Sequence, residues 1–489
     1  MSQSREVAAD LHEGTGLRLS RAAVPLICLA QLMATLDVTI VNLSLPTVQD
    51  AVGLSNAGLA WVVDAYTLAY GGLLLVGGRA GDLLGHRRTL MAGIALFTVA
   101  SAVAGLADGP EVLLAARAAQ GVGAALATPT TLSLITTLVP AGVRRTRAMV
   151  AYGSMAGVGI TLGLVLGGLL TEYLSWRWVF LVNIPLGIAV LVAAPRVLPD
   201  TRGRRRRLDV VGALLGTGAL SLLVYAVIDA GAQGWGDGVS TASFAGAAVL
   251  LAAFAFVESR APEPTLPLRL LRHRVRLGAY LVGGLLFASL YPAFFLLSRT
   301  LQDLRGLGPV DAGLRFLPIG VGVLAFALAT RRLIATTGPR LMVLVGTIAT
   351  AVAAVALVGL EPTTSYPLVL VPCLVGLGAG VGTTFVATAA LSMTDVPEED
   401  AGIAAGLLST FQAVGGSVGV AVVASLAAAR TEQLLGAVDG RPTPAAVREA
   451  LMSGFGRGFT VTALLAAAAV VAAAVTAPGR GSAPRGSAS

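Results

Sequence analysis

Lysine is absent from this chain of 489 residues, so all 34 of its basic side chains are arginines. Without lysine the chain cannot contain a complete P-loop, which excludes a nucleotide-driven motor built on that motif. The two cysteines, Cys28 and Cys373, lie in apolar stretches and cannot form the disulfide framework of a secreted domain. The three histidines are widely separated, so their spacing provides no metal-binding cluster.

Charged residues are also scarce. They make up 12% of the chain, whereas hydrophobic residues make up 55% and the mean hydropathy is +0.82. A water-soluble domain does not need so much apolar surface to form its core. Because a helix crosses the bilayer with about 20 apolar residues, and runs of that length recur along nearly the whole chain, the sequence predicts an all-α, polytopic membrane protein with fourteen transmembrane helices.

The positions of the arginines indicate how the chain is threaded through the membrane. Most of them lie before the first predicted span and in every second loop after it, as expected for cytoplasmic segments. This pattern predicts a multi-pass protein of the plasma membrane whose N- and C-termini are both cytoplasmic. Because the arginines are divided among loops, the net charge of +8 does not indicate a nucleic-acid partner. The expected partner is the lipid bilayer.

Two basic stretches divide the chain. PDTRGRRRRLD at 199–209 separates six predicted spans from the next two, and ESRAPEPTLPLRLLRHRVR at 258–276 separates those two from the last six. The predicted parts are a cytoplasmic leader (1–21), a six-helix bundle (22–195), a basic linker with two extra helices (196–258), the first five helices of a second bundle (259–428), an external loop (429–458), the last helix (459–477) and a disordered cytoplasmic tail (478–489).

Three ionisable residues lie inside predicted spans: Asp37, Asp64 and Arg117. A charge at the centre of a span costs about 2.5–3.5 kcal/mol on insertion scales, so such residues usually have a partner or a function. A carboxylate that is shielded from water and lies near an arginine can take up and release a proton as its surroundings change. The alternatives are that Asp64 lies near the headgroups and that Arg117 extends to the membrane surface.

A short loop between the second and third spans reads GRAGDLLGHRRTL (78–90). Gly78 and Gly85 permit a tight turn, and Asp82 can accept from a helix N-terminus and from Arg87 or Arg88. Such a group of charges can act as a latch that favours one conformation. The alternative is an ordinary basic loop with incidental glycines.

Glycines recur in the fifth predicted span, GSMAGVGITLGLVLGGLL (153–170). Four of them lie on or next to one helix face: Gly159, Gly163, Gly167 and Gly168. Small residues at such intervals let two membrane helices approach closely, so packing alone explains the pattern.

Together these strings resemble the major facilitator superfamily, and in particular its fourteen-helix drug:proton antiporter branch. The loop at 78–90 resembles the family's loop 2–3 signature, although His86 stands where arginine is common. LLAARAAQGVGAA (113–125) resembles its second motif, through Arg117, Gln120 and Gly121. The glycine-rich span is similar to its antiporter motif, with Leu164 in the place of a proline. LDVTIVNLSLP (36–46), SWRWVFLVNIPLG (175–187), LGPVDAGLRFLP (307–318) and AGIAAGLLSTFQAVGGSVGVAV (401–422) extend the resemblance over residues 20–428.

The resemblance implies a major-facilitator fold, in which two related six-helix bundles enclose a midplane cavity. A weak repeat agrees with this, because RRLIATTGPR (331–340) matches GRAGDLLGHR in position. It also implies a monomeric transporter, not an enzyme, that needs no cofactor and exports lipophilic or cationic drugs in exchange for protons. Asp37, Asp64 and Arg117 would then couple the proton to transport. The residues expected to line the substrate cavity are Asn42, Tyr66, Tyr70, Gln120, Phe294, Phe385 and Gln412.

Two other functions are compatible with the sequence. Because one fold can transport in either direction and Leu164 departs from the antiporter motif, the chain could import a small metabolite. A membrane sensor without transport activity is a further alternative, although the sequence has no soluble effector domain. The transported compound cannot be identified from one sequence, and the aromatic residues assigned to the cavity could instead face lipid.

Overall fold

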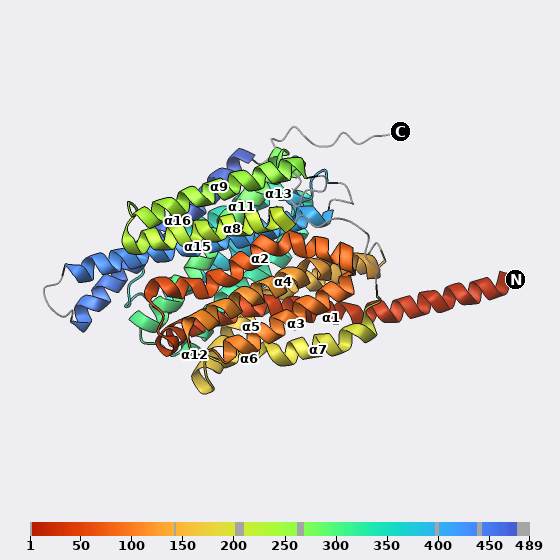
Figure 1. The fold of residues 1–489 in the computed structure, drawn as a ribbon, viewed down its shortest axis with the longest axis horizontal. Helices are drawn as coiled ribbons and strands as arrows, with labels where there is room; N and C mark the ends of the chain where they lie inside the picture. The colour runs from red at the N-terminus through yellow and green to blue at the C-terminus, as the bar shows by residue number, and fades with distance from the viewer. Residues whose placement is uncertain are drawn as a thin grey trace.

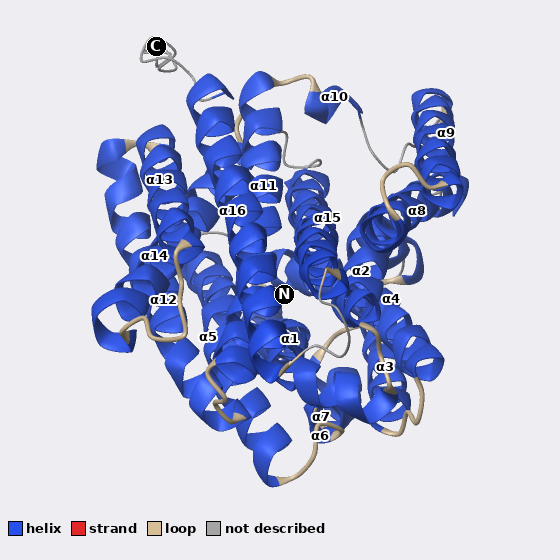
Figure 2. Ribbon diagram, turned by 90° about the vertical axis from the view of Figure 1, so that its left-hand side faces the viewer, coloured by secondary structure: helices blue, strands red, loops and turns tan. Residues whose placement is uncertain are grey.

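The structure is a computed structural model that describes residues 2–140, 143–200, 210–261, 268–396, 401–437 and 443–476. The predicted C-terminal tail and most of the basic stretch at 199–209 lie outside the described residues. Within the described part the chain is almost entirely helical, with no strand assigned. The all-α prediction is therefore confirmed (Figure 2).

The helices of the first half begin with α1 (Ser2–Val52), whose early part extends beyond the bundle (Figure 1). They continue with α2 (Asn56–Leu84), α3 (His86–Gly105), α4 (Pro110–Leu138), α5 (Val143–Tyr173), the short α6 (Trp178–Leu181) and α7 (Asn183–Val197). Two further long helices follow, α8 (Val210–Gln233) and α9 (Gly238–Arg260).

The second half starts with a single turn, α10 (Leu268–Leu271), and the long helix α11 (Arg274–Arg299), which ends in a π-helical turn, η1 (Thr300–Leu304). The remaining elements are α12 (Pro309–Thr337), α13 (Pro339–Val358), a second π-helical turn η2 (Tyr366–Leu370), α14 (Val371–Ser392), α15 (Ala401–Gly436) and α16 (Pro444–Thr476).

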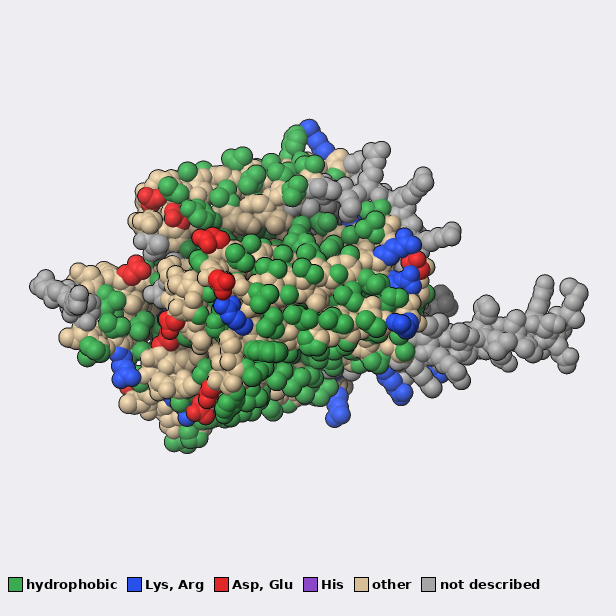
Figure 3. All heavy atoms as spheres, turned by 60° about the horizontal axis from the view of Figure 1, so that its bottom comes forward, with side chains coloured by type: hydrophobic (Ala, Val, Ile, Leu, Met, Phe, Trp, Pro, Cys, Tyr) green, Lys and Arg blue, Asp and Glu red, His purple; other side chains and the backbone are tan. Residues whose placement is uncertain are grey.

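Twelve helices of the described chain are long and apolar enough to cross a membrane. Helix α2 adds a thirteenth if its two parts, which meet at a bend of 53°, are counted as one span, and α8 contributes a shorter apolar stretch, Leu214–Ala230. Figure 3 shows hydrophobic side chains over the middle of one face and charged side chains toward its two ends. The chain is thus a multi-pass membrane protein, while the number fourteen stays a prediction.

The two halves use the same packing scheme. In the first half α1 packs on α5, α2 on α4 and α3 on α4, and in the second half α11 packs on α15, α12 on α14 and α13 on α14. The turns agree as well: Gly85 joins α2 to α3 at φ 93°, and Gly338 joins α12 to α13 at φ 79°. Because these backbone angles favour glycine, the weak sequence repeat at these two loops reflects the same turn made twice.

The halves meet along two seams, where α2 packs on α15 and α5 packs on α12. Helices α8 and α9 form a pair beside the bundle, and α8 packs against both α2 and α15 (Figure 2). One continuous hydrophobic core joins all three, with Val63 of α2, Val227 of α8 and Val420 of α15 in the same cluster. Helix α8 therefore covers one of the two seams.

Candidate functional site

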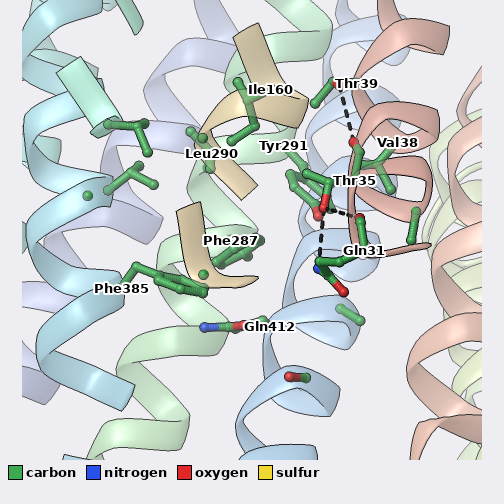
Figure 4. A pocket seen from close by; sticks show the side chains of 18 of the residues that line it. Gln31, Thr35, Val38, Thr39, Ile160, Phe287, Leu290, Tyr291, Phe385 and Gln412 are labelled. Carbon is green, nitrogen blue, oxygen red and sulfur yellow. Dashed lines mark hydrogen bonds between the residues drawn. The ribbon is translucent and has the colours of Figure 1, made fainter. Parts of the chain in front are cut away.

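A cavity of about 280 Å³ lies between the two halves. Its wall is built from α1, α2, α4 and α5 on one side and from α11, α12, α14 and α15 on the other. Figure 4 shows side chains from both halves around this space, among them Gln31, Tyr291, Phe385 and Gln412. A largely apolar wall with a few polar groups is typical of sites for small molecules.

The cavity residues expected from the sequence fall into two groups. Those that line the cavity are Asn42, Tyr66, Tyr70, Phe294, Phe385 and Gln412. Gln120 is fully buried instead and is absent from the described wall. Its amide nitrogen donates to Asp37, in a polar cluster behind that wall. Whether any of the wall residues contacts a substrate stays a prediction.

The polar cluster behind the wall centres on Asp37, whose side chain is fully buried. Arg117 Nη1 donates to Asp37 Oδ2 at 2.6 Å. Asp37 Oδ1 accepts from Gln120 Nε2 at 3.0 Å and from Asn183 Nδ2 at 2.9 Å. Every carboxylate oxygen therefore has a partner, and the ion pair has no net charge, which is how a membrane interior tolerates two charges.

Arg117 is also held at its other atoms. Its Nε donates to the backbone oxygen of Val62 at 2.8 Å, and its Nη1 also donates to Gln120 Oε1 at 2.9 Å. The guanidinium lies over the Tyr66 ring, 4.6 Å from the ring centre. With 1% of its side chain exposed, Arg117 does not extend to the membrane surface, and that alternative is wrong for this conformation.

Tyr66 connects this cluster to the cavity. The Arg117 guanidinium lies over the Tyr66 ring, which also stacks with the Tyr70 ring at a centroid distance of 5.9 Å. Both tyrosines line the cavity, whereas Asp37 and Arg117 do not belong to its described wall. A molecule in the cavity would therefore touch the aromatic layer and not the ion pair itself.

The second buried acid, Asp64, lies on the seam between the halves. Ser417 Oγ of α15 donates to Asp64 Oδ1 of α2 at 2.8 Å. Asp64 is fully buried, and its Oδ2 has no hydrogen-bond partner among the described residues. The alternative that Asp64 lies near the headgroups does not fit this position. An unsatisfied buried carboxylate oxygen is unusual in a membrane protein and makes Asp64 a candidate functional residue.

Hydrogen bonds join the halves at the end of the bundle opposite the N-terminus. Ser298 Oγ of α11 donates to the backbone oxygen of Asn42 at 2.9 Å, and Gln302 Nε2 of η1 donates to that of Leu43 at 3.2 Å. Gln31 and Asn42 both line the cavity, and eleven residues of helix span about 16 Å. The cavity thus extends from this seal toward the end of the bundle where the chain begins.

The predicted latch has a different set of partners from those expected. Asp82 is half exposed and lies 3.8 Å from His86 Nε2, while Arg87 and Arg88 both pair with Asp200, at 3.2 Å and 2.8 Å. Arg87 also donates to the backbone oxygen of Leu198 at 3.1 Å. The loop is therefore tied to the end of α7, because Asp200 lies closer to the two arginines than Asp82 does.

The glycines of α5 serve close packing, as the sequence suggested. A Cβ at Gly159 or Gly163 would meet the side chains of Thr35 and Thr39, and one at Gly167 would lie 2.6 Å from the backbone oxygen of Ile40. These positions face α1, the helix that carries Asp37. Gly168 faces α12 instead, where a Cβ would lie 2.5 Å from the backbone oxygen of Pro309.

The sequence did not predict a role for three residues of the site. Asn183 begins α7 after the break that follows α6, and Ser417 lies among the glycines of α15. A polar side chain in an apolar span was the available signal for both, but its helix face could not be assigned from one sequence. Arg331, expected in a loop, lies in α12 and lines the cavity.

A bundle of two similarly packed helical halves, with a cavity between them and buried charges behind its wall, defines a membrane transporter of small molecules. The chain belongs to the Major Facilitator Superfamily, whose family description matches residues 27–420. It is 40% identical to the puromycin resistance protein pur8 of Streptomyces alboniger over 92% of this chain and 88% of that protein.

Two further comparisons agree with this assignment. The chain is 39% identical to the cephamycin export protein CmcT of Amycolatopsis lactamdurans, over 84% of this chain and 85% of that one. Its fold is similar to that of a bacterial homolog of the human lysosomal transporter Spinster, with a TM-score of 0.64 at 14% identity, over 93% of this chain and 96% of that chain.

Proposed function

We propose that this transporter exports lipophilic drugs, antibiotics among them, across the plasma membrane in exchange for protons, by alternating access. The observation that carries the proposal is the cavity between the halves, with an aromatic wall, a seal at one end and a buried acid on the seam beside it. The relatives named for puromycin resistance and cephamycin export support the direction and the kind of cargo.

In this proposal Asp64 carries the proton. Its Oδ2 has no hydrogen-bond partner among the described residues, and its Oδ1 accepts across the seam from Ser417 Oγ. Loss of the proton would leave an ionised carboxylate at the contact between α2 and α15, which favours separation of the halves and access of water. Uptake of the proton would restore the closed seam.

The Asp37–Arg117 pair has a second role in the proposal. Its charges balance while both are ionised, and protonation of Asp37 would leave Arg117 as an uncompensated buried cation. In this proposal the pair changes its arrangement when Asp37 takes up a proton, and the change transmits movement of the Tyr66 layer to the helices of the first half. Asp37, Asp64 and Arg117 together form the proposed coupling site.

The energy available from protons is sufficient for export. Inward movement of one proton supplies about 2.3 kcal/mol per 100 mV of membrane potential and about 1.4 kcal/mol per pH unit. A gradient of either size can therefore drive one lipophilic molecule against a substantial concentration ratio, since a tenfold ratio corresponds to about 1.4 kcal/mol.

Export can be tested in a host that lacks its own drug pumps. Cells with and without the chain are challenged with a set of structurally diverse antibiotics that includes puromycin and a cephamycin, and accumulation of each compound is measured. We expect resistance to rise and accumulation to fall in energised cells, and an uncoupler should abolish both changes. Increased accumulation would instead indicate import, and no change for any compound would contradict transport of drugs. An Arg117→Ala variant, compared at equal amounts in the membrane, controls for overexpression.

A further inference from the structure

The charged residues of the cavity wall indicate which cargo it takes. Among the described residues, Arg331 is the one charged side chain that lines the cavity, and the wall contains no carboxylate. The nearby acids Asp37 and Asp64 lie behind the wall, bonded to Arg117 and to Ser417. A cation in the cavity would therefore meet a guanidinium and no counter-ion.

Arg331 lies in the part of α12 nearest the end of the bundle where α1 begins. Its side chain is partly buried, and its Nη1 is buried without a hydrogen-bond partner in the described part of the chain. Gly153 of α5 lies opposite, and a Cβ at that glycine would lie 3.0 Å from Nη2. The absence of a side chain at Gly153 gives the guanidinium its space between the two halves.

An arginine in this position is costly unless something pairs with it. The buried Nη1 has lost its hydration without gaining a partner, and ionisable residues inside membrane proteins usually mark the path of a substrate or an ion. None of the described acids lies within ion-pair distance of Arg331. The missing partner is then a ligand with an anionic oxygen, which an arginine binds with strong, directional hydrogen bonds.

The rest of the wall specifies the remainder of that ligand. Aromatic rings line it from both halves, among them Tyr66, Tyr70, Phe287, Tyr291, Phe294 and Phe385. Gln412, also in the wall, has an Nε2 without a partner among the described residues, so it can donate to a carbonyl or hydroxyl oxygen. Flat rings stack favourably on such a surface.

We propose that the preferred cargo is an aromatic compound with an ionised acid group, whose anionic oxygen accepts from Arg331 while its rings lie against the aromatic wall. This inference rests on the proposed function, since it names the cargo of that export. It also predicts selection against cations, because like charge in a site of low dielectric is repulsive.

The test compares three ligands with one ring system and different charge: anthracene-2-carboxylate, its carboxamide and 2-(aminomethyl)anthracene. The purified chain is placed in phosphatidylcholine nanodiscs, so that no anionic lipid headgroup supplies the counter-ion, and binding to empty nanodiscs is subtracted. We expect the carboxylate to bind about tenfold or more tightly than the ammonium compound, the factor typical of one charge-assisted hydrogen bond.

Two variants identify the residue responsible. Arg331→Gln should weaken binding of the carboxylate by about tenfold and change binding of the carboxamide by less than about twofold. Arg332→Gln is the matched control, because it removes the same charge from the next residue, which is exposed, and it should leave all three affinities unchanged. Retained binding of the carboxamide shows that Arg331→Gln is folded. If Arg331→Gln does not fold, the inference is tested by the order of the three affinities in the parent, in which the carboxylate should bind more tightly than the ammonium compound.

Several results would overturn the inference: equal binding of the carboxylate by parent and Arg331→Gln, tightest binding of the ammonium compound, or binding of none of the three. These outcomes differ from failure of the proposed function. A chain that prefers the ammonium compound but still lowers drug accumulation in cells remains an exporter with another cargo. If the chain prefers the carboxylate but changes the accumulation of no compound, the result supports the proposed acid preference and contradicts the proposed export.

Discussion

Arg117 lies over Tyr66, with its guanidinium carbon 4.6 Å from the centre of the ring, while the same guanidinium donates to Asp37 at 2.6 Å. Tyr66 is also part of the cavity wall. One aromatic side chain thus contacts both the space for a cargo and the buried ion pair. In the proposed mechanism, this contact lets a molecule in the cavity affect Asp37 without touching it.

Tyr66 can therefore be tested by removing either its hydroxyl group or its ring. Tyr66→Phe keeps the ring under Arg117 and should transport at close to the parental rate. Tyr66→Ala removes the ring and leaves a void, which should cost about 3–5 kcal/mol of stability and most of the transport. Thermal unfolding and uptake into proteoliposomes measure the two effects. Parental transport by Tyr66→Ala would show that the ring does not link the cavity to the ion pair.

The ion pair of Asp37 and Arg117 predicts non-additive effects. Arg117→Ala leaves Asp37 buried without its counter-ion and should lower stability by about 3–5 kcal/mol. In the double variant Asp37→Asn/Arg117→Gln no charge remains, so the melting temperature should return toward the parental value. Coupled transport should stay lost, because the proposed mechanism assigns proton coupling to the charged pair. If the double variant is no more stable than Arg117→Ala, the pairing energy has been misassigned.

Close packing of α5 on α1 makes a prediction with an internal control. A Cβ at Gly167 would lie 2.6 Å from the backbone oxygen of Ile40, whereas one at Gly157 would be 3.7 Å from its nearest neighbour, a side-chain atom of Leu324. Gly167→Ala should destabilise the protein by about 1–3 kcal/mol, as overpacking usually does. Gly157→Ala should stay within about 0.5 kcal/mol of the parent. Equal melting temperatures for the two variants would contradict this packing.

The predicted latch can be tested at two acids, Asp200 and Asp82. Asp200 pairs with both Arg87 and Arg88, so Asp200→Asn should release the loop from the end of α7 and slow transport. Asp82 is half exposed, and its contact with His86 at 3.8 Å is a surface contact. Asp82→Asn should therefore change stability by less than about 1 kcal/mol while still slowing transport. Transport rates and melting temperatures of both purified variants are compared with the parent. Parental transport rates in both variants would show that this loop does not act as a latch.

Much of the fold could be predicted because its signals are local. Apolar runs indicate the helices, and the two glycine turns at Gly85 and Gly338 mark the same junction in each half. The family and fold predictions are confirmed. The site was harder, because it depends on which face of a helix each residue occupies. Gln120 illustrates this: it was expected in the cavity, but it lies against Asp37 and Ser101.

Contacts between distant segments could not be predicted from the sequence. Ser417 meets Asp64 across 353 positions, and nothing in either helix alone indicates that contact. The sequence predicts that Arg331 lies in a basic loop, because arginines near the ends of spans usually lie in loops. Its place in the cavity wall depends on the extra turns of α12 and on the space that Gly153 leaves in α5.

Proton flux in proteoliposomes tests the central claim most directly. The parent chain is reconstituted with a pH indicator and an acidic interior, and a compound to which it confers resistance is added outside. We predict that the interior loses protons as the compound enters. Asp64→Asn, and likewise Asp37→Asn, should exchange the compound for itself without a change in internal pH. Entry of the compound into parental vesicles with no proton movement, or with protons moving in the same direction, would contradict proton-coupled export.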